Sequence, residues 1–157
     1  MKKIILFALI GFFILPGPAQ AESREVQITS TVHRNFDGTF RNDELAKEIA
    51  VGGRLWSLIF SSDLTPRIWV IDAALIEDIT AMTAPYELRD GKKLDSSIEA
   101  VAYLSQLKKV TRNAQVVSLP YGNPDPELAR ELAPSELNYY YKTAQTRLAT
   151  ALGRPVR

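Results

Sequence analysis

The sequence contains no cysteine and only one histidine among its 157 residues. Without cysteine there are no disulfide bonds and no thiolate chemistry, so an exported chain of this kind must be held together by its hydrophobic core. A lipoprotein anchor is excluded as well, because no cysteine follows the apolar N-terminal run. The paired histidines that metalloproteases and metal-dependent sugar deacetylases need are also missing. We therefore expect no metal and no cofactor.

Two further motif classes are absent. The sequence has no Gly-x-Ser-x-Gly turn, on which the serine nucleophile of an α/β-hydrolase sits, and no glycine-rich phosphate loop. The pair Gly52-Gly53 indicates tight packing or a kinked helix instead. His33 falls in a predicted loop, and we interpret this single histidine as a surface residue.

The sequence also lacks an excess of charge of one sign. It carries 19 basic and 18 acidic residues, and two of the lysines lie within the first 21 residues. Cleavage after Ala21 would leave 136 residues with 17 basic and 18 acidic side chains, a net charge of −1. Nucleic acids and anionic membranes require a concentrated basic patch. We therefore expect neither as the main partner.

Long apolar runs are absent except at the beginning of the chain. Lys2 and Lys3 precede an apolar run over residues 4–15, and Ala19-Gln20-Ala21 offers the small residues that a signal peptidase reads. This pattern predicts a signal peptide over residues 1–21 and a secreted, extracytoplasmic product. A retained N-terminal anchor is the alternative. After cleavage, no stretch is long enough to span a membrane.

Strand and helix patterns alternate along residues 22–157, which predicts a single α/β domain. Expected strands are residues 26–32, 67–71 and 115–119, and expected helices are residues 43–60 with a break at Gly52-Gly53, 73–82, 126–133 and 135–152. Another long helix, capped by Asp95 or Ser96, should have an apolar side that consists of Ile98, Val101, Ala102, Leu104 and Leu107. Strands that are separated by helices run parallel. The fold class is therefore a three-stranded parallel sheet with covering helices.

Three strands are few for a sheet whose faces and edges both need cover. Residues 154–157 resemble the beginning of a fourth strand. We therefore expect the domain to be truncated at its C-terminal end and to belong to a larger α/β barrel-like unit. A small three-stranded sandwich with a frayed tail is the alternative.

The most informative stretch is residues 116–125, VVSLPYGNPD, which runs from a buried strand through a polar turn into a helix at Pro126. Open α/β sheets and α/β barrels place their sites at such carboxyl ends of strands. Asp72 ends the preceding strand in the same way. If the two strands are neighbours, Asp72 and Asp125 would lie about 5 Å apart, or about 10 Å with one strand between, spacings that glycosidases use.

Side chains near these aspartates suit a sugar ligand. Tyr121 and Asn123 can bind sugar hydroxyls, and Trp69 can stack on a sugar ring if it points outward. A structural interpretation competes with this one, because Asp72 and Asp125 each stand where a helix N-cap is expected, and Asp125 is followed by proline. Tyr121, in turn, can bury its ring under the turn.

Four segments occur in a characteristic order, namely HRNFDGTF at 33–40, VGGRLWSLI at 51–59, RIWVIDAALIEDITAM at 67–82 and VVSLPYGNPDPELARELA at 116–133. Together they resemble one domain of an uncharacterised family of large secreted or membrane-anchored proteins in high-GC Gram-positive bacteria. Ala73 replaces a proline of the family pattern, and Asn123 replaces an aspartate. The resemblance covers about residues 32–157 and implies an outline similar to the α/β barrels of carbohydrate esterases and hydrolases. It implies no established activity.

Two functional hypotheses follow. The first is a non-enzymatic module of the cell envelope that binds cell-wall glycan or an envelope protein through the loops after the strands. The second is a glycoside-directed hydrolase that uses Asp72 and Asp125. The missing histidines and the short sheet favour the first.

Overall fold

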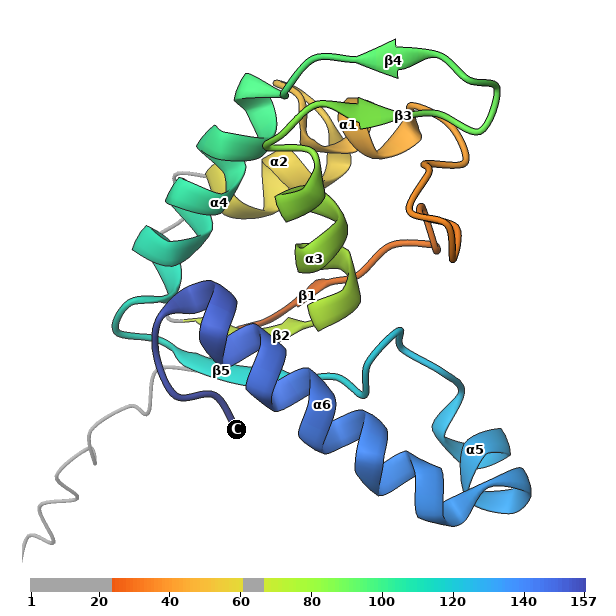
Figure 1. Cartoon of the computed structure of the whole chain (residues 1–157). Coiled ribbons are helices and arrows are strands. Elements are labelled where there is room, and N and C mark those ends of the chain that lie inside the picture. The colour runs from red at the N-terminus through yellow and green to blue at the C-terminus, as the bar shows by residue number, and fades with distance from the viewer. Residues whose placement is uncertain (1–23, 61–66) are drawn as a thin grey trace, which may run out of the picture.

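The computed structural model describes residues 24–60 and 67–157, and the predicted signal peptide lies outside them. Its centre is a parallel sheet whose strands β1 (Arg24–Ile28), β2 (Arg67–Ile71) and β5 (Gln115–Ser118) lie side by side in that order (Figure 1). β2 pairs in parallel with both of its neighbours. The predicted α/β class and the parallel pairing of the second and third strands are therefore confirmed.

β1 begins two residues earlier and ends four residues earlier than predicted. Ile28 pairs with Ile71, which is the last residue of β2, so residues 29–32 have no strand beside them. The alternating pattern in the sequence continues to Val32, but a ladder needs a partner as well as a pattern. Within β1 the alternation holds, because Val26 and Ile28 are buried while Gln27 is exposed.

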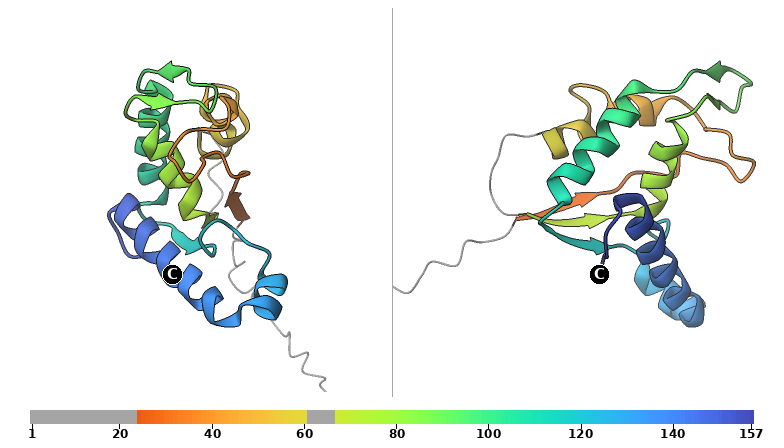
Figure 2. Two further views of the ribbon diagram at one scale, coloured as in Figure 1. Left: turned by 45° about the vertical axis from the view of Figure 1, so that its right-hand side comes forward. Right: turned by 60° about the vertical axis from the view of Figure 1, so that its left-hand side comes forward.

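The face of the sheet toward the helices is its buried face. Successive strand residues point to opposite sides, so the register groups the side chains of one face in rows. Two such rows cross the sheet, Val26–Trp69–Val116 and Ile28–Ile71–Ser118. All but Ser118 belong to the hydrophobic core, which also includes buried residues of the helices. Figure 2 shows the helices that follow β1 and β2 on this one side of the sheet.

The helical segment after β1 is split into α1 (Glu44–Ile49) and α2 (Arg54–Phe60), as the glycine pair suggested. Gly52 has a positive φ of 83°, which favours glycine. Gly53 is needed for a different reason, because a Cβ there would lie 2.3 Å from the carbonyl oxygen of Lys47. The turn between the helices therefore cannot form with a larger residue at position 53.

The segment after β2 contains α3 (Ala73–Ala81) and a small antiparallel hairpin that the sequence did not reveal. The hairpin consists of β3 (Tyr86–Glu87) and β4 (Lys93–Leu94), within a stretch predicted as loop. Strands of two residues are too short to show periodicity. The loop after β1 packs on this hairpin, since the buried ring of Phe40 meets Tyr86 edge-on at 5.0 Å.

α4 (Ile98–Thr111) is present, but its predicted cap is wrong and its predicted buried face is only partly right. Ser97, and not Asp95 or Ser96, accepts the capping bond, from the backbone N–H of Ala100. Ile98 is 80% exposed and Val101 53% exposed. Leu107 is buried as predicted, and the other buried residues of the helix are Ala100, Tyr103 and Thr111. The hydroxyl of Thr111 can be buried because it donates to the carbonyl of Leu107 within the helix.

α5 (Pro126–Leu132) and α6 (Pro134–Leu152) form a helical hairpin that extends away from the sheet (Figure 1). α5 buries none of its residues, whereas α6 packs against α3 and β5 through buried residues that include Ala144 and Leu148. α6 ends at Gly153, whose φ of 69° is the left-handed conformation of a helix stop.

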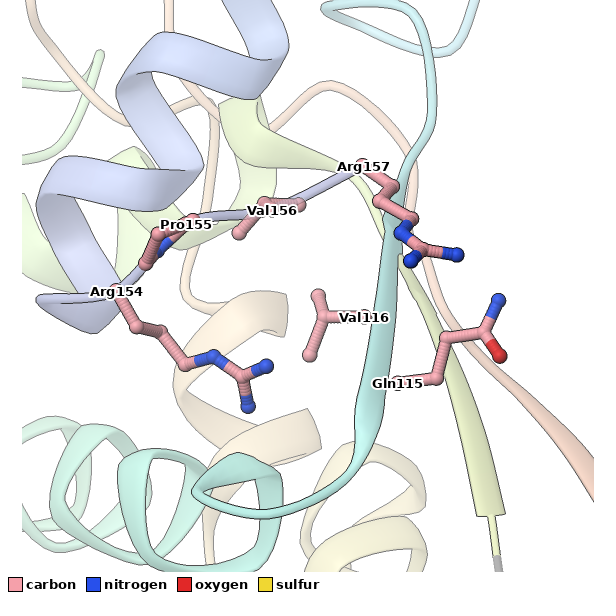
Figure 3. Close-up of a pocket in the computed structure, with 6 residues that line it drawn as sticks. All are labelled: Gln115, Val116, Arg154, Pro155, Val156 and Arg157. Atoms are coloured by element: carbon pink, nitrogen blue, oxygen red, sulfur yellow. The ribbon is translucent and has the colours of Figure 1, made fainter.

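The residues after α6 return to the sheet beside β5. The N–H of Arg157 donates to the carbonyl of Val116 at 3.2 Å, and the N–H of Ser118 donates to the carbonyl of Arg157 at 2.7 Å. This is the bonding of a parallel bridge, as expected for residues that begin a fourth strand. Arg154 turns toward the end of α4 and donates to the carbonyls of Thr111 and Arg112, which leaves a pocket of about 290 Å³ against β5 (Figure 3).

Within residues 24–60 and 67–157, none of the helices has the length and hydrophobicity that crossing a bilayer requires.

Candidate functional site

Asp72 lies at the carboxyl end of β2 and links it to the turn after β5. Its Oδ1 accepts the N–H of Ala74 at 3.0 Å, which caps α3, and the N–H of Gly122 at 3.2 Å. The residue is only 4% exposed. Burial raises the pKa of this carboxyl, the two backbone N–H donors lower it, and nearby Glu77 raises it. Asp72 is thus a cap and also a tie between two adjacent strands.

The turn after β5 is built by its backbone. The N–H of Asn123 donates to the carbonyl of Pro120 at 2.8 Å, and Gly122 has a φ of 76°, as the third residue of a type II turn requires. Asn123 itself has a φ of 46°, a conformation that asparagine tolerates better than most residues. Its side chain is exposed, so it remains available to a ligand.

Tyr121, Glu77 and Arg147 form a network that joins this turn to α3 and α6. The hydroxyl of Tyr121 donates to Glu77 Oε2 at 2.5 Å, and Arg147 donates to Glu77 Oε1 at 2.6 Å. The guanidinium of Arg147 also lies over the Tyr121 ring, 5.0 Å from its centre. Burial and the hydrogen bond to Glu77 raise the pKa of Tyr121 to about 12. The phenol therefore stays protonated near neutral pH and acts as a donor.

Asp78 is the most strongly perturbed carboxyl among the described residues. Burial raises its pKa to about 6; Arg34 works against this shift, and the negative charges of Asp72 and Glu77 add to it. The Nε of Arg34 lies 3.5 Å from Asp78 Oδ1, and the backbone N–H of His33 is a further donor to this carboxyl. Asp78 therefore fastens the loop after β1 to α3.

His33 is not the surface residue that the sequence suggested, because it is only 2% exposed. Its Nε2 lies 2.8 Å from the hydroxyl of Ser30, which also donates to the carboxylate of Glu48 at 3.1 Å. Arg54 holds Glu48 in turn at 2.6 Å. Burial lowers the pKa of His33. Since the serine proton is directed at Glu48, the hydroxyl accepts from the imidazole, and the cluster ties the loop to α1 and α2.

A groove of about 600 Å³ lies between α3, α4 and α6. Its charged lining residues come from four separate parts of the chain: Arg34, Glu77, Lys108 and Arg147. Thr80 and Thr150 add hydroxyl groups, and a small apolar floor is formed by Ala81, Leu104 and Ala151. The groove shares Glu77 and Arg147 with the tyrosine network, although neither Tyr121 nor Asp72 lines it.

The structure brings some of the predicted site residues together and separates others. Asp72 and Tyr121 belong to one connected cluster, through Gly122 and Glu77. Trp69 does not belong to it: the indole is 2% exposed and lies in the core, so the prediction that it stacks on a sugar is corrected. It points toward the helices because its neighbours across the sheet, Val26 and Val116, lie on the buried face.

Asp125 lies apart from Asp72. It is exposed at the start of α5, where its Oδ1 accepts the N–H groups of Glu127 at 2.9 Å and Leu128 at 3.1 Å. Figures 1 and 2 show α5 well away from β2 and α3. The loop of residues 119–125 leads the chain outward from the sheet, so a position just beyond a strand in sequence is distant from it in space.

Four functional groups of this region, Arg34, Asp78, Lys108 and Arg147, could not be identified from the sequence. Lys108 and Arg147 lie outside the quoted motifs, and Arg34 lies in one that implies no role for it. The raised pKa of Asp78 depends on burial that only the fold creates. Within the described ranges, no cluster of three or more histidine, cysteine, aspartate or glutamate side chains is arranged to hold a metal ion.

Comparison with known proteins adds no relative: no protein-family model matches the sequence, and no curated protein matches it significantly. The resemblance to the family of large secreted proteins stays a prediction. The site is therefore interpreted from its own residues.

Proposed function

We propose that this chain is a secreted, extracytoplasmic module that binds a cell-envelope glycan without cleaving it, and that the groove between α3, α4 and α6 is the binding site. The observation that carries the proposal is the lining of this groove. Charged groups and threonine hydroxyls surround a floor of Ala81, Leu104 and Ala151. A sugar ring presents hydroxyls at its rim and a less polar face, which matches a few placed polar groups around an apolar surface.

The state of the two predicted carboxylates supports binding over hydrolysis. A glycosidase needs two carboxyl groups that flank the scissile bond. Asp72 and Asp125 each use an oxygen for two backbone N–H groups, and they belong to different parts of the molecule. Capping accounts for both residues without a substrate.

The location in the envelope rests on the N-terminal sequence, where two lysines, an apolar run and Ala19-Gln20-Ala21 form the pattern of a signal peptide. The resemblance to large secreted proteins of high-GC Gram-positive bacteria points in the same direction. The absence of cysteine is compatible with this location but does not argue for it. An envelope protein is the other partner that this location allows.

The experiment is a binding measurement with purified, solubilised cell-wall glycan and the chain beginning at Glu22. Thr150 lines the groove, is exposed and donates its hydroxyl to the carbonyl four residues earlier. Thr150→Trp should fill the groove and weaken binding roughly tenfold or more, which corresponds to about 1.4 kcal/mol.

Thr146 supplies the matched control. It lies one turn earlier in α6, is also exposed and makes the same kind of backbone hydrogen bond, but it does not line the groove. Thr146→Trp should bind as the parent does. Equal binding of the glycan by both variants would show that the groove is not the binding site.

A glycoside-directed hydrolase remains the second candidate, because Asp78 has a pKa of about 6. A general acid requires a carboxyl group whose pKa is raised toward the working pH, and burial raises the pKa of Asp78 in that direction. Incubation with the same glycan should release no new reducing ends. Release that disappears in Asp78→Asn would favour the hydrolase.

A further inference from the structure

The charges that line the groove are not balanced. Arg34 comes from the loop after β1, Lys108 from α4 and Arg147 from α6, while Glu77 of α3 is the single acidic lining residue. Asp78, which lies beside Arg34, is a second acidic group next to the groove. Three cations therefore face two carboxyl groups in this part of the molecule.

One of the three cations is already satisfied inside the protein. Arg147 contacts Glu77 at 2.6 Å and lies over the ring of Tyr121. Glu77 in turn accepts the hydroxyl of Tyr121, so both of its oxygens are engaged. This pair is held as a unit and contributes little net charge to a ligand.

The other two cations keep unused capacity. The side chain of Lys108 is exposed and makes no hydrogen bond or ion pair with any residue that the structure describes. Arg34 has a single, long contact of 3.5 Å with Asp78, made through its Nε. A guanidinium has five N–H donors in a planar fork, and most of those of Arg34 remain available. Both side chains line the same groove.

We propose that the glycan bound in this groove is anionic, and that Lys108 and Arg34 bind its carboxylate or phosphate group. This inference rests on the proposed function and specifies its ligand. The arginine fork suits the two oxygens of either anion, and the lysine adds a compact point charge. The apolar floor holds the sugar ring to which the anion is attached.

The test is calorimetric titration of the chain beginning at Glu22 with three oligomers of similar length. One is an oligomer of a uronic acid, one is an oligomer of glycerol phosphate that carries sugar substituents, and one is neutral maltohexaose. We expect one anionic oligomer to bind at least about tenfold more tightly than maltohexaose, with an affinity that falls as salt is added. The two anionic arms distinguish carboxylate from phosphate as the source of the charge.

Lys108→Gln provides the residue-level test, and its neighbour provides the control. Lys108→Gln should weaken binding of the preferred anionic oligomer roughly fivefold and leave maltohexaose unaffected, because one charge contact is lost. Lys109 is also exposed and carries the same charge, but it does not line the groove. Lys109→Gln should bind as the parent does.

The outcomes separate this inference from the proposal beneath it. Equal binding of neutral and anionic oligomers, still sensitive to Thr150→Trp, overturns the anionic ligand and keeps the glycan groove. Equal losses in Lys108→Gln and Lys109→Gln indicate only general charge attraction and also overturn it. If the chain binds cell-wall glycan but neither anionic oligomer, the inference is overturned alone. If it binds neither the oligomers nor cell-wall glycan, the proposed function is overturned with it.

Discussion

Asp72 and Asp125 perform the same local task in two contrasting regions of the molecule. Each precedes a helix and accepts a backbone N–H from its first turn. Asp72 is buried at the end of the central strand, and its second bond comes from Gly122, fifty residues away in the chain. Asp125 is exposed, and both of its bonds come from the helix it begins. One aspartate therefore connects the fold, and the other only starts a helix.

The difference shows how much a cap depends on what surrounds it. Further polar groups lie near Asp72, chief among them Glu77, Asp78 and Tyr121. They link α3 to α6, to the loop after β1 and to the turn after β5. Around Asp125, α5 buries none of its residues. A lost hydrogen bond can be replaced by water at Asp125, but not at a residue that is 4% exposed.

The largest effect should follow from Asp72→Ala. The substitution removes the cap of α3, which typically costs about 0.5–2 kcal/mol, and leaves the N–H of Gly122 without its acceptor, which costs about 1–3 kcal/mol more. Relief of the buried charge offsets part of this, so we expect a net loss of about 2–4 kcal/mol in the free energy of unfolding, measured by urea denaturation.

Asp72→Asn is the control for that experiment. The amide keeps an acceptor oxygen that can serve both N–H groups, and it carries no charge, so most of the stability should return. A loss in Asp72→Ala no greater than that in Asp125→Ala would show that the bond to Gly122 contributes nothing, and the contrast between the two aspartates would collapse.

These two residues also illustrate how far the sequence alone can lead. Both caps were predictable, because an aspartate followed by a helical segment is a local pattern. The parallel order of the strands followed from the helices between them. The bond from Gly122 to Asp72 was not predictable, since it joins residues whose proximity depends on the completed sheet.

The remaining errors have similar causes. His33 was expected at the surface because a loop histidine usually is, but the hairpin and α1 enclose its loop. The face of α4 was partly misassigned because Ala100 and Thr111 counted little in an apolar pattern, although both are fully buried. The groove is lined by Arg34, Lys108 and Arg147, which come from three distant segments, and no sequence pattern indicates that they lie together.

A second prediction concerns the pH dependence of the buried region. The pKa of Asp78 is about 6 in the folded state, against an ordinary value of 3.8. Between these values the folded protein holds a proton that the unfolded chain has released, so the free energy of unfolding falls as the pH rises from about 4 to about 6. At roughly 1.4 kcal/mol per pKa unit, the loss is about 2–3 kcal/mol.

Asp78→Asn isolates this effect in parallel denaturation series from pH 4 to pH 7. His33 acts in the opposite direction, because burial lowers its pKa and the unfolded chain takes up protons first as the pH falls below 6.5. The difference between parent and Asp78→Asn removes that contribution. If the free energies of unfolding of the two proteins differ by a constant amount over this range, Asp78 is not the titrating group. The pH dependence would then not distinguish the buried region from the exposed one.

The smallest effect belongs to the exposed region. Asp125 accepts two N–H groups at the start of α5, with proline as the next residue, so Asp125→Ala should cost about 0.5–2 kcal/mol. Asp125→Ser should restore most of that loss, because a hydroxyl can accept the same bonds. Thermal melts of the three proteins measure this, with release of reducing ends from cell-wall glycan followed in the same samples.

A serine can replace an aspartate as a cap but not as a catalytic acid or nucleophile of a glycosidase. Retained stability in Asp125→Ser together with loss of a measurable glycan cleavage would therefore make Asp125 a catalytic residue, and the exposed end of α5 would become the more important of the two regions.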